Sequence, residues 1–212
     1  MFTADVRGRD RMSENPEGPA AELASEVRHR TANTLQLLAT LARMRGQKAS
    51  DAELRRQMIW MAEAIGAVGS LERRRTPDGI DFAGYIDEMA PVWRRRQGGQ
   101  AVDVVVRLEP IHIRDQAAST LALILNELMA NALTHGLQGA AVRRIIIDLA
   151  RNGEGARLSV TDAGPGLRAD QPESRERFGL WLARSLTAQV SGQLVLLPAP
   201  AGGLTAQLDF KL

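Results

Sequence analysis

The stretch Asn126-Glu127-Leu128-Met129-Ala130-Asn131-Ala132-Leu133-Thr134-His135-Gly136 ends a strongly apolar segment that begins near residue 115. Apolar residues recur there at helical spacing, so the segment 115–135 predicts an amphipathic helix that stops at Gly136. Glu127, Asn131 and His135 are four residues apart, and we expect them along one edge of the apolar stripe. This pattern alone is also typical of a core helix with a polar edge.

These three side chains suit a site for metal and phosphate. The amide oxygen of Asn131 can join phosphate oxygens around Mg²⁺, which prefers oxygen ligands. Glu127 can position a metal-bound water or act as a base, and His135 can reach a phosphate.

A second motif, Asp162-Ala163-Gly164-Pro165-Gly166, follows a predicted strand at 156–161. A carboxylate at a strand end can accept a hydrogen bond from an adenine amino group. Gly164 and Gly166 allow the backbone to approach a ligand closely, although a plain turn has the same composition. After a loop, Gly179-Leu180 begins a helix, and a helix N-terminus is a natural phosphate site.

The elements around these motifs predict an α/β domain. Further helices are expected at 82–96 and 179–190. Strands are expected at 101–108, 143–149, 156–161, 193–197 and 204–210.

The N-terminal part of the chain predicts a different unit. Residues 1–19 resemble a flexible tail. Helices are expected at 20–45 and 52–75, with Ser50-Asp51 as a cap, and a short connection favours an antiparallel hairpin. The turn at 77–79 marks the boundary, which gives a hairpin at 20–76 and a second domain at 80–212.

The first helix has an apolar stripe that a hairpin alone does not cover, so pairing of two copies into a four-helix bundle is expected. The stripe consists of Leu23, Val27, Leu37, Leu38, Leu41 and Met44. His29 lies about 140° from the middle of the stripe and is predicted to be exposed. Glu26 and Asn33 lie one turn away, so the ring is either a nucleophile that Glu26 orients or deprotonates, or an ordinary surface histidine.

Composition excludes several classes of protein. The 212 residues contain no Cys and three His, which excludes a disulfide framework and argues against a zinc site. No apolar run approaches the ~18–20 residues of a membrane span, and the N-terminus has no signal-peptide core, so a cytoplasmic protein is expected. The runs at 73–75 and 94–96 are interpreted as solvated helix ends rather than a nucleic-acid patch.

Together, the motifs resemble those of the sensor histidine kinases, in the short-lid branch whose dimerisation helix carries His-Arg-x-x-Asn. The matching segment is Glu26-Val27-Arg28-His29-Arg30-Thr31-Ala32-Asn33, and the resemblance extends over about residues 20–212. It implies a two-domain α+β protein. A dimeric helical hairpin would precede a Bergerat-type (GHKL) α/β sandwich that binds ATP and Mg²⁺.

The resemblance also implies residue roles. His29 matches the phosphoacceptor, Glu127 the acid of the helix motif, Asn131 the Mg²⁺ ligand and Asp162 the adenine-binding aspartate. Gly164 and Gly166 shape the adenine wall, and Gly179 and Leu180 match the shortened second glycine box. The phosphoryl group would pass from His29 to an aspartate of a response-regulator receiver domain.

Two other functions stay open. One is a histidine phosphotransferase or pseudokinase adaptor that relays phosphate without ATP, and the other is a Ser/Thr kinase that restrains a partner factor. Ala32 and Thr134 stand where the family often has lysine. No sensor domain is recognisable before the hairpin. The kinase either stands alone, is a piece of a longer chain, or takes its input from a sensory partner, although the N-terminus favours a native end.

Overall fold

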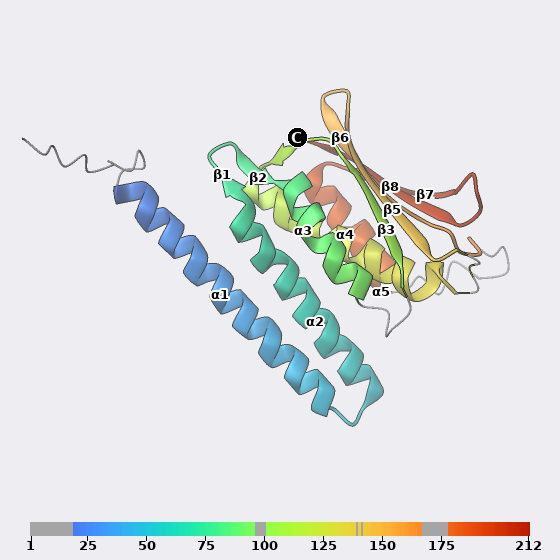
Figure 1. Cartoon of the computed structure of the whole chain (residues 1–212), viewed down its shortest axis with the longest axis horizontal. Helices are drawn as coiled ribbons and strands as arrows, with labels where there is room; N and C mark the ends of the chain where they lie inside the picture. The colour runs from blue at the N-terminus through green and yellow to red at the C-terminus, as the bar shows by residue number, and fades with distance from the viewer. Residues whose placement is uncertain (1–18, 96–100, 139, 141, 167–177) are drawn as a thin grey trace, which may run out of the picture.

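The computed structural model describes residues 19–95, 101–138, 140, 142–166 and 178–212. A helical hairpin precedes a five-stranded sheet that carries helices on one face, as Figure 1 shows. The predicted fold class, a hairpin followed by an α/β domain, is confirmed. The predicted tail at 1–18 and the loop at 167–177 lie outside the described residues.

The hairpin consists of α1 (Pro19–Lys48) and α2 (Ala52–Leu71), which a short 3₁₀ turn, η1 (Glu72–Arg74), continues. Asp51 caps α2 as predicted, because its side chain accepts a hydrogen bond of 2.7 Å from the Leu54 amide. The inner face of α1 carries small residues: Ala32 and Ala39 are buried, and a Cβ on Gly69 of α2 would lie 3.1 Å from Leu35. Ala32 is therefore inside the hairpin, where a lysine would bury its charge.

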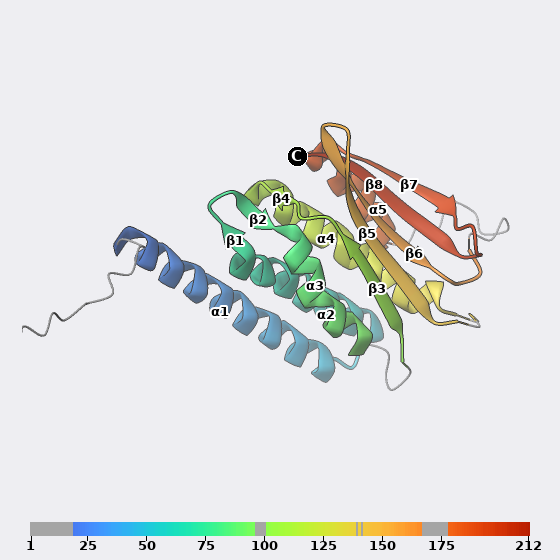
Figure 2. The same cartoon turned by 45° about the horizontal axis from the view of Figure 1, so that its top comes forward.

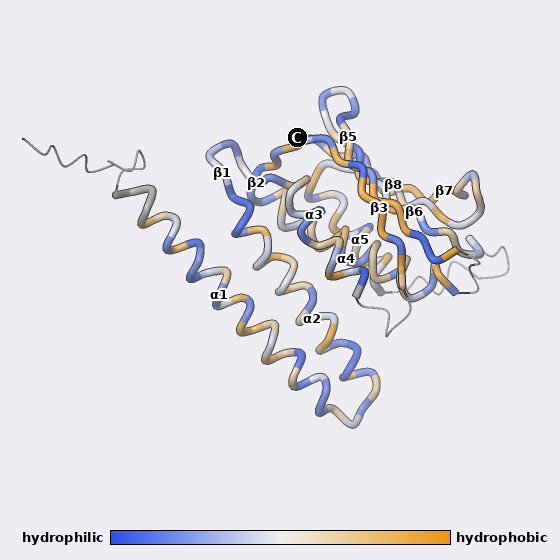
Figure 3. Tube along the Cα trace, viewed as in Figure 1, coloured by the Kyte–Doolittle hydropathy of each residue, from blue (hydrophilic) through white to orange (hydrophobic). Residues whose placement is uncertain are grey.

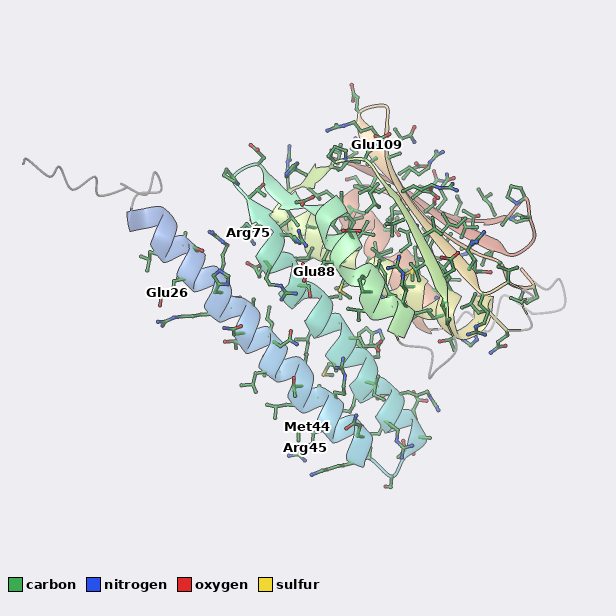
Figure 4. The ribbon with its side chains drawn as sticks, in the orientation of Figure 1. Glu26, Met44, Arg45, Arg75, Glu88 and Glu109 are labelled. Carbon is green, nitrogen blue, oxygen red and sulfur yellow. The ribbon has the colours of Figure 1, made fainter. Side chains whose placement is uncertain are left out.

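The predicted apolar stripe lies on the opposite, open side of α1. Its six residues, from Leu23 to Met44, are each 47–63% exposed. Figure 3 shows hydrophobic positions at intervals along α1, and Figure 4 shows the labelled Met44 pointing away from α2. The hydrophobic side chains of this stripe are therefore not covered by α2.

The sheet has the order β3-β5-β6-β8-β7, in which β3 and β5 are parallel and the other pairs antiparallel. The strands are β3 (Asp103–Leu108), β5 (Arg144–Asn152), β6 (Gly155–Asp162), β7 (Gln193–Pro198) and β8 (Leu204–Lys211). Their order along the chain and their approximate bounds agree with the sequence-based prediction.

Three helices cover one face of this sheet: α3 (Phe82–Arg95), α4 (Asp115–Asn131) and α5 (Phe178–Thr187). A π-helical turn, η2 (Ala132–Gly136), continues α4, and a 3₁₀ turn, η4 (Ala188–Val190), continues α5. The core between the layers includes Trp93 and Tyr85 of α3, Leu121 and Met129 of α4, and Ile145 of β5. Figure 2 shows the hairpin outside this helix layer, with α2 against α4.

One helix differs from the expectation that no apolar segment is long enough to span a membrane. By length and hydropathy the segment Asp115–Gly136 is able to span a membrane, but 67% of its most apolar window is buried within the fold. Such burial is typical of a core helix, so the length and hydropathy of this segment are only weak evidence for a membrane span.

The predicted boundary at 77–79 is the turn of a small β-hairpin. Strands β1 (Arg75–Thr76) and β2 (Gly79–Asp81) pair with each other, and β2 pairs with β4 (His112–Ile113) of the second domain. Gly79 has a φ of 117°, and a Cβ there would lie 2.7 Å from the Ile113 carbonyl oxygen. In this conformation the junction is therefore ordered secondary structure.

The arginines at 73–75, predicted to be solvated, form ion pairs across this junction. Arg73 and Arg74 both bind Glu88 of α3, the latter at 2.9 Å, and Arg75 binds Asp115 at the start of α4. Burial would raise the pKa of Glu88, but hydrogen bonds from the two guanidiniums outweigh it and lower that pKa. Figure 4 labels Arg75 and Glu88 at this junction.

Arg94 of the second arginine run donates a hydrogen bond of 2.6 Å to the Val104 carbonyl. Neighbouring elements are thus held together by Arg73, Arg74, Arg75 and Arg94, because each of these arginines has a carboxylate or carbonyl partner on another element.

Candidate functional site

The first group of predicted site residues lies at the end of α4. Glu127 is only 5% exposed, whereas Asn131 and His135 are half-buried. The predicted straight edge is interrupted after Asn131, because His135 belongs to the π-helical turn. An i→i+5 turn holds more residues than an α-helical one, and such turns are frequent at functional sites.

Gly179 comes close to this group from α5. A Cβ on Gly179 would overlap the Oε2 atom of Glu127 and would lie 3.7 Å from Nδ2 of Asn131. Any larger residue would therefore displace the Glu127 carboxylate. Leu180 follows in the first turn of α5 and is half-buried. The structure thus brings Glu127, Asn131 and Gly179 together across about 50 residues of sequence.

Trp60 of α2 also belongs to this group, although sequence reasoning missed it. Its indole Nε1 donates a hydrogen bond to Oε1 of Glu127. The contact joins residues 67 positions apart, and no local sequence pattern indicates it. A side chain of the hairpin is therefore in direct contact with the carboxylate predicted to act in the second domain.

Asp162 forms the second group, at the end of β6. The side chain is 8% exposed, and Oδ1 accepts hydrogen bonds from the amides of Gly164, at 3.0 Å, and Leu204, at 3.3 Å. Burial raises the pKa of Asp162, and the two hydrogen bonds only partly oppose this. Among the described residues, both bonds end on Oδ1, which leaves Oδ2 for a ligand.

Glycines enclose the Asp162 carboxyl group. A Cβ on Gly136 would overlap this carboxyl group, one on Gly164 would overlap the Gly136 carbonyl, and one on Gly203 would overlap the Asp162 carbonyl. Gly166 has a φ of 72° and would place a Cβ 3.0 Å from the Gly203 carbonyl oxygen. The backbone segments therefore approach one another and Asp162 more closely than residues with a Cβ would allow.

The third group surrounds His29 on α1, and the ring is exposed as predicted. Glu26, expected to assist the ring, instead pairs with Arg30 at 2.5 Å, and Asn33 is exposed one turn further on. Figure 4 shows Glu26 pointing to the outer side of α1. Beside His29 lies a pocket of about 140 Å³, lined by Ser25, Arg28, His29, Glu72, Arg73 and Arg75.

His29 is far from the other two groups in this conformation. It lies beside Glu72, at the end of the hairpin where α2 finishes, whereas Trp60 contacts Glu127 near the middle of α2. Twelve residues of helical rise between Trp60 and Glu72 amount to about 18 Å. Figure 1 accordingly shows the beginning of α1 and the end of α4 at opposite ends of the molecule. The roles assigned to all these residues stay predictions.

Comparisons with known proteins find similarity in the second domain and over most of the chain. Residues 94–194 match the family of histidine kinase-like ATPase domains. The chain is 24% identical over 188 residues to the sensor histidine kinase PdtaS of Mycolicibacterium smegmatis, which is 84% of this chain and 37% of that protein. It is also 24% identical over 197 residues to blue-light-activated histidine kinase 2 of Erythrobacter litoralis, or 86% of this chain and 56% of the relative. The chain therefore spans less than two thirds of each of these relatives.

Two solved structures share the fold. The histidine kinase domain of the blue-light-activated kinase EL346 of Erythrobacter litoralis superposes with a TM-score of 0.66 at 21% identity, covering 90% of this chain and 91% of that one. Full-length ShkA in complex with AMPPNP gives a TM-score of 0.52 at 18% identity, over 89% of this chain and 45% of that one. The helical hairpin followed by an α/β domain is thus the arrangement found in histidine kinase domain structures, and residues 94–194 match the model of histidine kinase-like ATPase domains.

Proposed function

We propose that this protein is an ATP-dependent histidine kinase that phosphorylates itself on His29. It would then pass the phosphoryl group to an aspartate of a response-regulator receiver domain. One observation carries the proposal: a histidine kinase-like ATPase domain gathers Glu127, Asn131 and Gly179 in a chain whose hairpin exposes His29.

The residues present fit ATP. The Asp162 carboxyl group is the proposed acceptor for the amino group of a flat base, and its Oδ2 atom takes neither of the two backbone hydrogen bonds that end on Oδ1. The phosphates would lie toward Asn131, His135 and the Gly179-Leu180 turn, where the first amides of α5 are available as donors. The AMPPNP complex of ShkA supports nucleotide binding by this fold.

Asn131 would hold Mg²⁺ through its amide oxygen, and the bound metal would neutralise charge on the phosphates. Glu127 lies one helical turn before Asn131, and a buried carboxylate there is able to orient a water or accept a proton.

The transfer itself needs an unprotonated ring nitrogen on His29. The nitrogen lone pair forms the new N–P bond while the bond from the γ-phosphorus to its bridging oxygen breaks, and ADP leaves with that electron pair. The proton on the other ring nitrogen goes to water or to a carboxylate. Glu26 serves this purpose only after it leaves Arg30, its partner in the present conformation.

Because His29 and Glu127 are held apart here, the ATPase domain must move, or a second chain must supply one of the two sites. The exposed stripe on α1 supports a homodimer through the hairpin. We place this kinase in the cytoplasm, with a separate sensory partner as one source of input.

The test is autophosphorylation of the purified chain with labelled ATP and Mg²⁺, comparing wild type with His29→Ala. The matched control is His112→Ala, because His112 is exposed on β4. We expect acid-labile label in wild type and His112→Ala and none in His29→Ala. Acid-stable label would favour the Ser/Thr kinase. Absence of both label and ATP binding would favour a phosphotransferase that relays phosphate without ATP.

A further inference from the structure

We propose that the pocket beside His29 is a phosphoryl-binding site, in which Arg28 and Arg73 hold the phosphoryl group that His29 carries. This inference rests on the proposed function of His29 as phosphoacceptor. It adds two residues from different elements, Arg28 of α1 and Arg73 of η1, to the chemistry of that group.

The size of the pocket suits the ligand. Its volume is about 140 Å³. A water molecule needs about 10–15 Å³ of such space, so the pocket admits a group of several heavy atoms. His29 lines the pocket directly, and a phosphoryl group on its ring is therefore within reach of the other lining residues.

The charge of the lining also suits the ligand. Three guanidiniums and one carboxylate line the pocket. The carboxylate, Glu72, is engaged by Arg75 through two hydrogen bonds of 3.0 and 3.3 Å. Cationic character is therefore supplied by Arg28 and Arg73. A phosphoryl group carries about −1.5 to −2 charge near neutral pH, and guanidinium forks match its oxygens.

The neighbouring ion pair orients the guanidinium of Arg73 without cancelling the local positive charge. Arg73 binds Glu88, but Arg74 shares the same carboxylate, so two cations face one anion. Arg73 also donates a hydrogen bond of 3.2 Å to Ser70. A guanidinium held in this way needs little rearrangement to receive an anion, and preorganised donors stabilise the charge that develops during phosphoryl transfer.

A small phosphoryl donor tests the pocket without ATP. In wild-type protein treated with phosphoramidate, a ring nitrogen of His29 forms an N–P bond as the donor's P–N bond breaks. Ammonia leaves and takes up the ring proton. Phosphohistidine on His29 and on His112 is then quantified in the same sample by ³¹P NMR and mass spectrometry, with His112 as the internal reference.

We expect His29 to be loaded about tenfold faster than His112, because the guanidiniums attract the anionic donor. Arg28→Met and Arg73→Met should each lower this ratio several-fold, and Arg28→Lys should restore most of it. The matched control, Arg43→Met, removes an exposed cation from the same helix about four turns away and should leave the ratio unchanged. Added salt should shrink the wild-type preference.

The two arginine substitutions lie on different elements, so a folding defect in one leaves the other informative, and circular dichroism verifies both. An unchanged ratio in both folded variants refutes the pocket, as does preferential loading of His112 in wild type. Retained preference for His29 with neither ATP binding nor labelling by ATP would instead refute the proposed kinase and keep the pocket.

Discussion

The indole Nε1 of Trp60 donates a hydrogen bond to the buried carboxylate of Glu127, and this contact joins the hairpin to the predicted nucleotide site. Trp60 belongs to α2, which packs on α4. The same packing keeps His29 about 18 Å along the hairpin from Trp60. For ATP bound near Glu127 to reach His29 of the same chain, the contact between Trp60 and Glu127 has to break.

Trp60→Phe should therefore increase the initial rate of His29 phosphorylation by about five- to tenfold, since a contact of about 1 kcal/mol no longer holds the domains together. The melting temperature should fall by a few degrees, because a buried carboxylate loses one hydrogen bond. Rate and melting are measured with labelled ATP and by calorimetry. Met61→Leu, a change at the adjacent exposed residue, is the control. A slower rate at unchanged stability would contradict the interpretation.

Asp162→Asn should weaken ATP binding by about tenfold or more, because a charged acceptor for the adenine amino group is lost. The same change should raise the melting temperature of the ligand-free protein at neutral pH. In wild type the folded-state pKa of Asp162 is raised above its ordinary value of 3.8, so folding stability decreases as pH rises from about that value through the folded pKa. Calorimetry with AMPPNP and melting curves from pH 4 to 8 measure both effects. Wild-type affinity in the variant would remove Asp162 from the site.

Glu88→Gln should make the free energy of unfolding less dependent on pH in the acid range. The pairs with Arg73 and Arg74 lower the pKa of Glu88, so their stabilisation is present above the unfolded value near 4.5 and is lost as pH falls through the folded pKa. At neutral pH the substitution should cost about 1 kcal/mol, since the pair is partly exposed. Denaturant unfolding between pH 3 and 7 measures this. Asp87→Asn, at the neighbouring exposed position, should leave the profile as it is in wild type.

Leu37→Lys combined with Leu41→Lys should convert a dimer into a monomer in analytical ultracentrifugation, because both residues belong to the exposed stripe of α1. Gln36→Lys with Thr40→Lys adds the same charge about 100° around the helix and should leave the dimer intact. A wild-type protein that sediments as a monomer at micromolar concentration would show that the stripe has another role.

The helices and the individual strands of the main sheet were predictable from the sequence because each is long enough to show a period, whereas the strand order was not predicted. The apolar stripe of α1 was predicted as well, and the structure leaves it exposed. The inner face of the hairpin was harder to identify. Ala32, Ala39 and Gly69 let the helices approach closely, but such small side chains contribute little to a hydrophobic pattern.

The short strands, the ion pairs of the arginines and the contact of Trp60 depend on partners that are distant in the sequence, and a local sequence pattern does not reveal such partners. Strands β1, β2 and β4 have only two or three residues each, too few to show alternation. The sequence of the arginines at 73–75 is equally typical of a solvated helix end, and only the fold places Glu88 and Asp115 opposite them. Trp60 looks like any aromatic residue of an amphipathic helix, and only the fold brings it to Glu127.

The glycines around Asp162 have a consequence for directed evolution of this domain. Gly136, Gly164 and Gly203 come from three separate segments, and a methyl group on any of them would overlap an atom that the other segments supply. In a random library selected for nucleotide binding, alanine should be depleted at all three positions. At Gly164 and Gly203 the clash is with a backbone carbonyl oxygen, which no side-chain substitution removes, whereas at Gly136 it is with the side chain of Asp162, which the site needs. Variation in specificity would have to arise at the edges of the site, while its centre stays unchanged.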